Sequence, residues 1–439
     1  MQKRLLATLS LIIAAMMIAT LTGTGRARAA DSLVLWTKFN TENTTDPNSQ
    51  EKWAAQALKD FTAKTGQAIT HIVQPFDQIN SKLNIAVQAK GDVPDISYID
   101  TQNIPFFVKN GALQDISAYV KAASWFKDLT PGALTACTGP DGKIYCVPTS
   151  LAGGSTYYWT SVYPNGFPKS AQDLLVAAQK LKDPAGKKYA VTMKASEGIS
   201  LQMTWFPLIV SAGGQIADPK TGKAAWANQQ VADVVAWGRA MFGGKYAPEV
   251  DLNTGFDDET PFMNGDAGAF LAGSWSYVYL NPLTAPDGTK FDNGAASVQK
   301  AFDAGKLNFA PPLVWNDGKP ALMVTGTAYA IPVGAKNIKG AQSWIDFQLN
   351  AAENAKFAAA YGAIPTLGEA SKDAAFQTPY WKAISSNLTT YAQNPPALTD
   401  YDKGVAALTN VINKLIVDPS ADIMKELQAE QDNYNNGLQ

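Results

Sequence analysis

The sequence predicts an α/β protein built from two discontinuous lobes, and three observations carry that prediction. Strand-like and helix-like segments alternate through the first quarter of the chain. About 410 residues remain beyond a removable N-terminal segment, which is too long for a single hydrophobic core. A strand-like segment at 321–332 then follows a long stretch in which strand signals are sparse. A late strand that rejoins an early sheet makes the chain cross between lobes more than once, so a cleft is expected between them.

The first elements follow from the spacing of their apolar residues. Residues 33–39 are a nearly continuous apolar run, typical of a buried strand, and 51–65 carry apolar residues at helical spacing before Gly66. The next elements are expected as strands at 68–76 and 95–100 and helices at 78–90 and 104–110. Strands separated by helices in this order pair in parallel.

Later elements are mostly helical. A strand is expected at 267–273, within a middle region that holds clear amphipathic helices. The expected helices are 170–182, 229–242, 338–349, 352–361, 402–417 and 421–435.

The first thirty residues indicate export. Lys3 and Arg4 precede an apolar run from Leu5 to about Leu21, and Ala27-Arg28-Ala29 is an A-x-A cleavage pattern. We interpret residues 1–29 as a signal peptide removed near Ala29-Ala30, which makes the mature protein periplasmic or secreted. A membrane anchor is the alternative, but the run is short for a spanning helix and a cleavage site follows it.

Charge and cysteine content narrow the function classes. Loss of Lys3, Arg4, Arg26 and Arg28 leaves 32 basic and 38 acidic residues, a net charge of −6. A mildly acidic chain without a basic cluster is a poor candidate for binding nucleic acid or anionic lipid.

The two cysteines, Cys137 and Cys146, flank a Gly-Pro-Asp-Gly turn. In an oxidising compartment we expect a disulfide, which stabilises by roughly 2–3 kcal/mol on a chain-entropy model. A redox pair or a metal site fits neither the spacing nor the ligand count.

Catalytic patterns are largely missing from the sequence. His71 is the only histidine and lies in an expected strand, so no HExxH zinc site is available and a Ser-His-Asp triad would have to use this residue. No G-x-S-x-G elbow, Walker loop or G-x-G-x-x-G after a strand occurs. We therefore expect no enzyme, no cofactor and no metal. A secreted glycosidase stays open as an alternative because it needs only two carboxylates.

Nine segments, in order, resemble the extracellular solute-binding proteins of ABC importers, in particular the carbohydrate-binding subgroup that includes maltose-binding proteins. They are LVLW, PFDQINSKLNIAVQAKGDVPDISYID, VKNGALQDIS, DGKIYCVPTS, FPKSAQDLLVAAQKLK, WFPLIVSAGG, FMNGDAGAFLAGSW, AYAIPVGAKNIKGAQSWIDFQL and KFAAAYGAIPT. The resemblance covers essentially the whole mature chain. It departs at AYAIP, where members often carry Gly-Trp-Gly before Ile-Pro.

The resemblance implies a periplasmic-binding-protein fold of the larger, class II type, with hinged lobes. One lobe would hold 31–149 plus 324–375 and the other 150–323 plus 376–439, with the first hinge crossing at 147–154. It implies a monomer that captures a neutral sugar or oligosaccharide in the interlobe cleft and delivers it to a membrane permease. A polyol or a glycerol phosphodiester is the alternative ligand. A phosphate ligand normally calls for arginine, and the mature chain holds only Arg239.

Aromatic residues are the first candidates for contacts, because a sugar ring presents an apolar face to a flat side chain. Trp275 follows an expected strand, and by resemblance it stacks on the sugar from the second lobe. Trp205 is a cleft or core residue, and Trp36 stands at the C-terminal end of the first strand, where open α/β sheets place ligands. Further candidates are Tyr157 and Tyr158 after the hinge, Tyr329 at the place of the missing Gly-Trp-Gly, and Tyr401. We interpret Trp226, Trp237, Trp344 and Trp381 as core residues on helices.

Polar partners are expected near the same strand ends. Asp100 ends a strand, where a carboxylate accepts sugar hydroxyls, and the family often uses this position. Gln78 opens the helix after Pro-Phe-Asp, and Asp77 is expected to cap that helix. Asn40 and Glu42 are expected at the rim.

Overall fold

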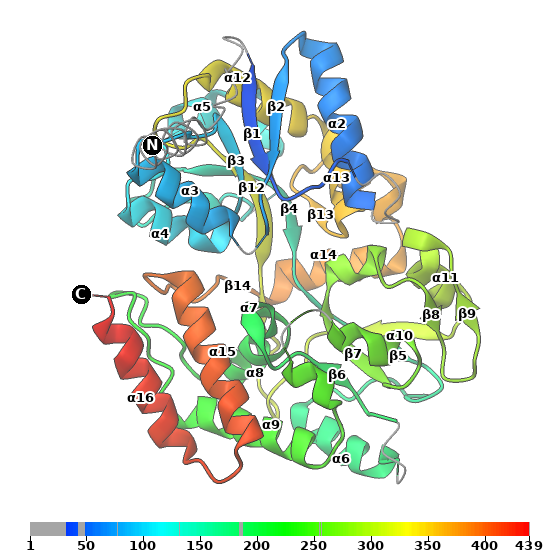
Figure 1. Cartoon of the computed structure of the whole chain (residues 1–439). Helices are drawn as coiled ribbons and strands as arrows, with labels where there is room; N and C mark the ends of the chain where they lie inside the picture. The colour runs from blue at the N-terminus through cyan, green and yellow to red at the C-terminus, as the bar shows by residue number, and fades with distance from the viewer. Residues whose placement is uncertain are drawn as a thin grey trace, which may run out of the picture.

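The computed structural model describes residues 32–42, 49–76, 78–130, 132–183, 188–253, 255 and 257–438. Over these residues the chain forms two lobes, one above the other in Figure 1, each built on its own β-sheet. The expected signal peptide, 1–29, lies outside the described residues.

The first sheet has six strands in the order β13-β4-β12-β3-β1-β2. They are β1 (Leu33–Thr37), β2 (Ile69–Val73), β3 (Ile96–Asp100), β4 (Cys146–Ala152), β12 (Thr325–Ala330) and β13 (Ile364–Pro365). Parallel pairing of β1 with β2 and with β3 confirms the prediction from their alternation with helices. β12 lies antiparallel between β3 and β4, so the predicted late strand does rejoin the early sheet.

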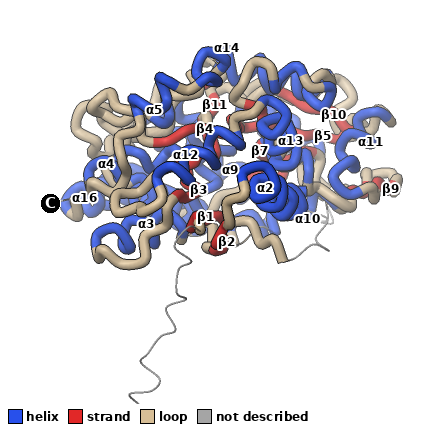
Figure 2. Tube along the Cα trace, turned by 90° about the horizontal axis from the view of Figure 1, so that it is seen from above, coloured by secondary structure: helices blue, strands red, loops and turns tan. Residues whose placement is uncertain are grey.

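Helices pack on both sides of the first sheet. They are α2 (Ser49–Thr65), α3 (Ile79–Gln88), α4 (Ile104–Lys109), α5 (Ser117–Ala122), α12 (Ile338–Gln348) and α13 (Ala351–Tyr361). Figures 1 and 2 both place α2 beside α13, away from α3 and α4. α2 stops where predicted, because Gly66 adopts a φ of 72° and turns the chain toward β2.

The second sheet has four strands in the order β10-β5-β7-β6. They are β5 (Gly154–Trp159), β6 (Thr192–Met193), β7 (Ala269–Gly273) and β10 (Leu307–Ala310), with a small separate pair, β8 (Leu283–Thr284) and β9 (Lys290–Phe291). Its helices are α6 (Ala171–Leu181), α7 (Glu197–Ser200), α8 (Phe206–Ser211), α9 (Gln229–Gly243), α10 (Thr260–Met263), α11 (Ser297–Asp303), α15 (Tyr401–Val417) and α16 (Ile423–Asn436). Side chains fix two helix starts: Ser170 accepts a hydrogen bond from the Asp173 amide, and Asn228 accepts one from the Val231 amide.

The chain passes between the lobes at three places. Gly153 alone separates β4 of the first sheet from β5 of the second. β11 (Leu322–Met323) leads into β12, and β14 (Ala392–Gln393) pairs beside it after α14 (Pro379–Tyr391). The crossings pack tightly, since a methyl group on Gly153 would lie 2.9 Å from Leu322 and 3.0 Å from Leu388.

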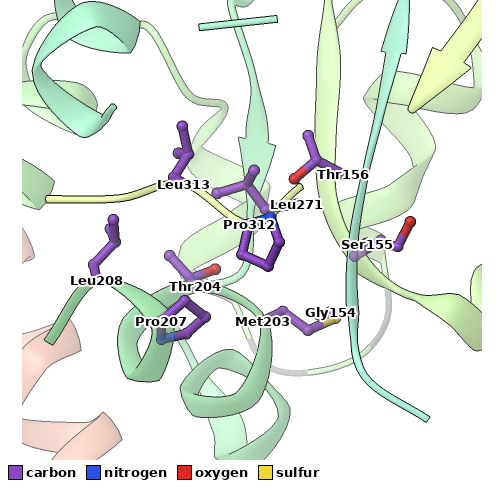
Figure 3. A pocket seen from close by; sticks show the side chains of 11 residues that line it. Gly154, Ser155, Thr156, Met203, Thr204, Pro207, Leu208, Leu271, Pro312 and Leu313 are labelled. Carbon is purple, nitrogen blue, oxygen red and sulfur yellow. The ribbon is translucent and has the colours of Figure 1, made fainter. Parts of the chain in front are cut away.

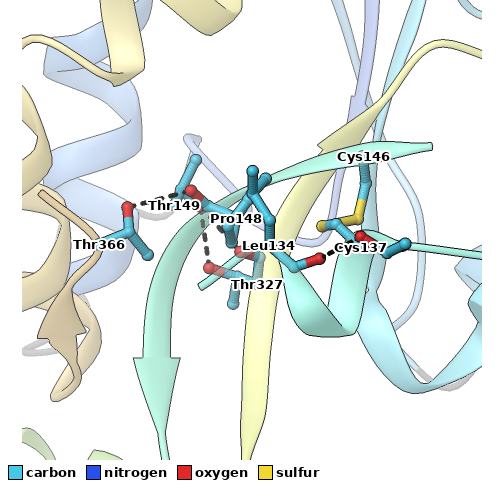
Figure 4. The surroundings of a disulfide bond; sticks show 8 residues. Leu134, Cys137, Cys146, Pro148, Thr149, Thr327 and Thr366 are labelled. Atoms are coloured by element: carbon cyan, nitrogen blue, oxygen red, sulfur yellow. Dashed lines mark hydrogen bonds between the residues drawn. A yellow bond between two sulfur atoms is a disulfide. The ribbon is translucent and has the colours of Figure 1, made fainter. Parts of the chain in front are cut away.

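The expected disulfide is present, between Cys137 and Cys146, whose Cα atoms lie 5.0 Å apart. Cys146 is the first residue of β4, the strand that runs into the Gly153 crossing. Figure 4 shows the disulfide at one end of this strand and threonine hydrogen bonds further along it. There the Thr149 hydroxyl lies 3.0 Å from that of Thr327, and Thr366 donates to the Pro148 carbonyl over 3.1 Å. The start and the middle of β4 are thus held in place before the chain crosses.

A buried ion pair joins elements of the second lobe. The side chains of Lys194 and Asp258 are 1% and 6% exposed, and their charged atoms lie 3.5 Å apart. The Lys194 ammonium also donates to the carbonyls of Asn253 and Gly255. Nearby, the Asp251 carboxylate accepts from the Thr192 hydroxyl, and burial raises the Asp251 pKa well above its usual value. Lys194 therefore holds the loop before α10 against β6.

Among the described residues, none of the helices is both long and apolar enough to cross a bilayer.

Candidate functional site

Polar and aromatic side chains from both lobes meet at one place, which we call the junction cluster. Its members are Lys38, Asn80, Tyr98, Asp100, Asn103 and Tyr361 of the first lobe and Trp275, Tyr279 and Asp402 of the second. The lobes touch directly here, because the Asn103 amide donates to the Asp402 carboxylate over 3.1 Å. Asn103 ends the short 3-10 helix Thr101–Asn103 that follows β3, and Asp402 lies in the first turn of α15.

Trp275 lies at this junction, in the 3-10 turn Ser274–Val278 that follows β7, and its side chain is partly exposed. Gly362 of the first lobe, with a φ of 71°, packs on its backbone, since a methyl group there would lie 2.7 Å from the Trp275 Cα. Gly273 makes room for the indole ring, because a methyl group on it would lie 2.2 Å from Trp275 Cζ2. The indole is therefore seated on backbone from its own lobe, directly beside the other lobe.

Tyr361 directly precedes Gly362, the residue that packs on the Trp275 backbone, and it brings a lysine and a second tyrosine to the junction. The Tyr361 hydroxyl lies 3.3 Å from the Lys38 ammonium and 3.4 Å from the Tyr98 hydroxyl. Lys38 also stacks over the Phe76 ring at 4.6 Å and the Tyr361 ring at 4.7 Å. Burial raises the pKa of Tyr98 and of Tyr279 well above the usual tyrosine value, so both hydroxyls stay protonated and can donate.

Asp100 is the carboxylate of the first lobe at the junction, at the C-terminal end of β3. The Asn80 amide donates to it over 3.4 Å. Burial raises the pKa of Asp100 to about 6; the charge of Asp402 adds to the rise, while the Lys38 ammonium and hydrogen bonds from Asn80 and Tyr98 oppose it. The protein thus holds a carboxylate here at an electrostatic cost, which is typical of functional sites.

The raised pKa of Asp100 predicts a pH-dependent stability. Below about pH 4 the carboxyl is protonated in both the folded and unfolded chain, and above about pH 6 it is ionised in both. The folded chain binds more protons between these limits, so this group lowers stability as pH rises from about 4 to about 6. We expect Asp100→Asn to raise the melting temperature more at pH 7 than at pH 4, measured by calorimetry; an equal gain at both pH values would contradict this.

The other predicted aromatics lie in the hydrophobic cores. Trp36 is 8% exposed, Trp205 and Tyr157 are 0%, Tyr329 is 1% and Tyr401 is 4%. Each is held by packing or bonding inside its lobe: the Trp205 ring against Gly238, the Tyr329 ring edge-on to Trp344, and the Tyr157 hydroxyl on that of Tyr380. Tyr158 is also buried. These side chains are therefore buried in the cores of the two lobes.

The predicted core tryptophans are confirmed as buried: Trp226, Trp237, Trp344 and Trp381 are all at most 5% exposed. Trp226 precedes α9 rather than lying on a helix, and its indole donates to the Leu427 carbonyl over 3.2 Å.

The predicted polar rim residues are exposed. Asn40 and Glu42 form a local turn in which the Glu42 amide donates to the Asn40 side chain over 3.2 Å. Gln78 precedes the first turn of α3 and its side chain makes no capping hydrogen bond. Asp77, the expected cap, lies outside the described residues.

Several members of the junction cluster were not predicted from the sequence. Tyr361 ends a helix whose pattern suggests only packing, and Asn103 and Asp402 are 299 positions apart. Lys38 follows directly after β1, in the loop after the strand that also led to the prediction of Asn40 and Glu42. Only this last position carried a signal that could have found it.

Two cavities away from the junction do not suit a sugar. One, of about 10 Å³, lies under the second sheet among Thr156, Met203 and Pro312 (Figure 3), and it is too small for more than one water. The other, of about 440 Å³, lies between α5 and α12 of the first lobe. There Tyr119 and Trp125 both donate to one oxygen of Asp346, and no residue of the second lobe lines it, so lobe closure cannot enclose a ligand in it.

His71 lies in β2, as predicted, and bonds to the Thr37 hydroxyl through Nε2 over 2.7 Å. Burial lowers its pKa to about 4, so the ring is neutral at physiological pH. Among the described residues, no group of three or more histidine, cysteine, aspartate or glutamate side chains is arranged to hold a metal ion.

A family model described as bacterial extracellular solute-binding protein matches residues 56–383. The chain belongs to this family. This solute-binding protein is 23% identical over 357 residues to the diacetylchitobiose binding protein DasA of Streptomyces coelicolor, which covers 77% of the chain and 73% of the relative.

Solved structures of ABC-transporter solute-binding proteins share its fold. One from Thermotoga lettingae, bound with α-D-tagatose, superposes with a TM-score of 0.76 and 18% identity over 93% of this chain and 100% of that one. Another, from Agrobacterium radiobacter in complex with ribitol, has a TM-score of 0.75 and 18% identity over 92% and 98%. The predicted two-lobed fold is therefore confirmed.

Proposed function

We propose that this solute-binding protein reversibly captures a sugar or short oligosaccharide, without negative charge, between its two lobes. The observation that carries the proposal is the junction cluster, where Trp275 of the second lobe and polar groups of the first converge beside Gly362. An aromatic face and a ring of hydrogen-bonding groups are what a sugar needs.

Each lobe supplies a different part of the binding site in this proposal. Trp275 stacks on the apolar face of a sugar ring, while Asp100 and Asn80 accept and donate hydrogen bonds to its hydroxyls. Tyr98 and Tyr361 line the opposite side. Closure of the lobes then buries the ligand, and a few such contacts suffice for micromolar affinity, about −8 kcal/mol.

The proposed lobes are 31–149 plus 324–375 and 150–323 plus 376–439, hinged where Gly153 joins β4 to β5. The tight fit of Gly153 against Leu322 and Leu388 supports a hinge of few degrees of freedom. Closure there moves the lobes as units, because each keeps its own sheet.

The proposed partner is the membrane permease of an ABC importer, which docks the closed form. Export by a cleaved signal peptide, location in the periplasm or medium, and a monomeric state complete the proposal. Binding without turnover is expected, since the family and the similar proteins are binding proteins.

A thermal-shift screen against mono-, di- and trisaccharides and ribitol tests the proposal. A ligand present at 100 times its dissociation constant stabilises the folded state by about 2.7 kcal/mol, which gives a clear shift. If no sugar or polyol raises the melting temperature, the proposal is wrong.

A polyol is the second candidate ligand, favoured by the similarity to the ribitol-bound structure. A glycerol phosphodiester is disfavoured by the place of the one arginine in the mature chain. Arg239 donates to the carbonyls of Leu415, Asp418 and Ala421 at the end of α15, so its guanidinium is engaged away from the junction.

A secreted glycosidase is the remaining alternative, since Asp100 and Asp402 are both carboxylates. Chromatography of any bound oligosaccharide after long incubation decides it, because cleavage products appear only if the protein turns the sugar over.

A further inference from the structure

The junction cluster is rich in hydrogen-bond acceptors that carry negative charge. Asp100 directly precedes the 3-10 helix that ends at Asn103, and the Asn103 amide donates to the Asp402 carboxylate over 3.1 Å, so the two carboxylates lie on either side of the contact between the lobes. Glu259 lies on the second-lobe side near Tyr279, and burial raises its pKa to about 7. Each lobe therefore brings a carboxylate to the junction cluster, Asp100 from the first and Asp402 from the second.

No protein cation in the described part of the chain forms a close ion pair with these carboxylates. Among the described residues, no ammonium or guanidinium lies within 4 Å of Asp100, Asp402 or Glu259. The Lys38 ammonium lowers the Asp100 pKa, but it is bonded to the Tyr361 hydroxyl and lies over the rings of Phe76 and Tyr361 rather than in an ion pair with Asp100. A partly desolvated carboxylate without an ion pair is costly unless something else supplies the positive charge.

Asn80 gives an independent sign of a ligand with donors. Its side chain is 6% exposed, and its Nδ2 already donates to Asp100. Its Oδ1 has no hydrogen-bond partner among the described residues. An acceptor buried in this way needs a donor, since an unmet buried acceptor costs about 1–3 kcal/mol. Asn80 thus holds an unpartnered acceptor on the same side chain whose Nδ2 donates to Asp100.

We propose that the site prefers sugars that carry a protonated amine, with the ammonium between Asp100 and Asp402 and a third donor hydrogen on Asn80 Oδ1. An ammonium has three donors and no acceptor, which matches this set of groups. The inference rests on the proposed sugar-binding function and narrows its substrate class to amino sugars. The inference adds to stacking and hydroxyl contacts the requirement that the ligand carry a positive charge.

Isothermal titration at pH 7 with three disaccharides of one linkage tests it: chitobiose with free amines, diacetylchitobiose and cellobiose. They differ only in the ammonium, acetamide or hydroxyl group on each ring. We expect chitobiose to bind about tenfold tighter than cellobiose or more, as a charged hydrogen bond implies. Glucosamine and glucose form the matching monosaccharide pair.

Asp100→Asn removes the negative charge of this side chain and nearly keeps its shape, so it tests the charge alone. It should weaken both sugars, but chitobiose about tenfold more than cellobiose, because the amide keeps an acceptor for a hydroxyl and loses the charge that binds an ammonium. Asp92→Asn, an exposed carboxylate before β3 at the opposite edge of the sheet, is the matched control and should change neither.

The outcomes are distinct. Equal affinity for amine and hydroxyl sugars, or equal weakening of both by Asp100→Asn, overturns the inference and leaves the proposed function standing. So does binding of other sugars when neither amine-bearing probe binds. If no sugar binds at all, both proposals fall.

Discussion

Replacing Trp275 by alanine should weaken ligand binding by about a hundredfold. Loss of one stacked face and the apolar area it covers corresponds to roughly 2–3 kcal/mol. Folding should be little affected, because the indole is partly exposed and the contact with Gly362 is made by the Trp275 backbone. Titration calorimetry with a sugar found in the thermal-shift screen measures the loss.

Two further variants serve as controls for the loss of affinity expected from Trp275→Ala. Trp275→Phe keeps an aromatic face and should recover most of the affinity. Trp315→Ala removes another partly exposed tryptophan of the second lobe, outside the junction cluster, and should leave affinity within about twofold. If Trp275→Ala binds as tightly as the unaltered protein, Trp275 is not a ligand contact.

Lys194→Met should cost about 3–5 kcal/mol of stability, the largest loss we expect from a single charge. The substitution keeps the length of the side chain but removes the ammonium that pairs with Asp258, in a place where neither side chain reaches water. A buried carboxylate left without its partner is strongly destabilising. Denaturant unfolding of the variant and the unaltered protein measures the difference.

The loss should depend on pH and on the partner. The Lys194 ammonium lowers the pKa of Asp251 and of Glu259, both of which burial raises, so its removal raises these pKa values further and the folded chain binds more protons than the unfolded chain. The deficit should therefore be smaller at pH 5 than at pH 8. The double change Lys194→Met with Asp258→Asn should regain part of the stability; no recovery and no pH effect would show that packing, and not charge, is at work.

Local patterns sufficed for most of the fold. The apolar spacing of 51–65 and the glycine after it gave α2 to within two residues, and the late apolar run correctly predicted β12. Partner choice was harder: that β12 lies between β3 and β4, antiparallel to both, depends on contacts between distant segments that no local pattern encodes.

The candidate site was predicted only in part. Trp275 and Asp100 each stand at a strand end, a local cue, and the structure brings them to one junction. The same cue also picked Trp36, which is buried, because a strand end does not tell on which face of the sheet a side chain lies. Asn103 and Asp402 come into contact only through the packing of the two lobes. No local sequence pattern around either residue predicts this hydrogen bond.

The position of β12 has a consequence for how the chain is made. β12 fills the centre of the first sheet, yet all four strands of the second sheet precede it in the sequence. Until residues 325–330 have been synthesised, β3 and β4 lack their shared neighbour, and the first lobe stays incomplete with unpaired strand edges. Pairing β12 with β4 closes the long loop between them, and contacts between such distant segments form slowly. The chain therefore stays incompletely folded during that delay. The first sheet therefore closes only after every strand of the second sheet has been made, so the sheet that begins first along the chain is completed last.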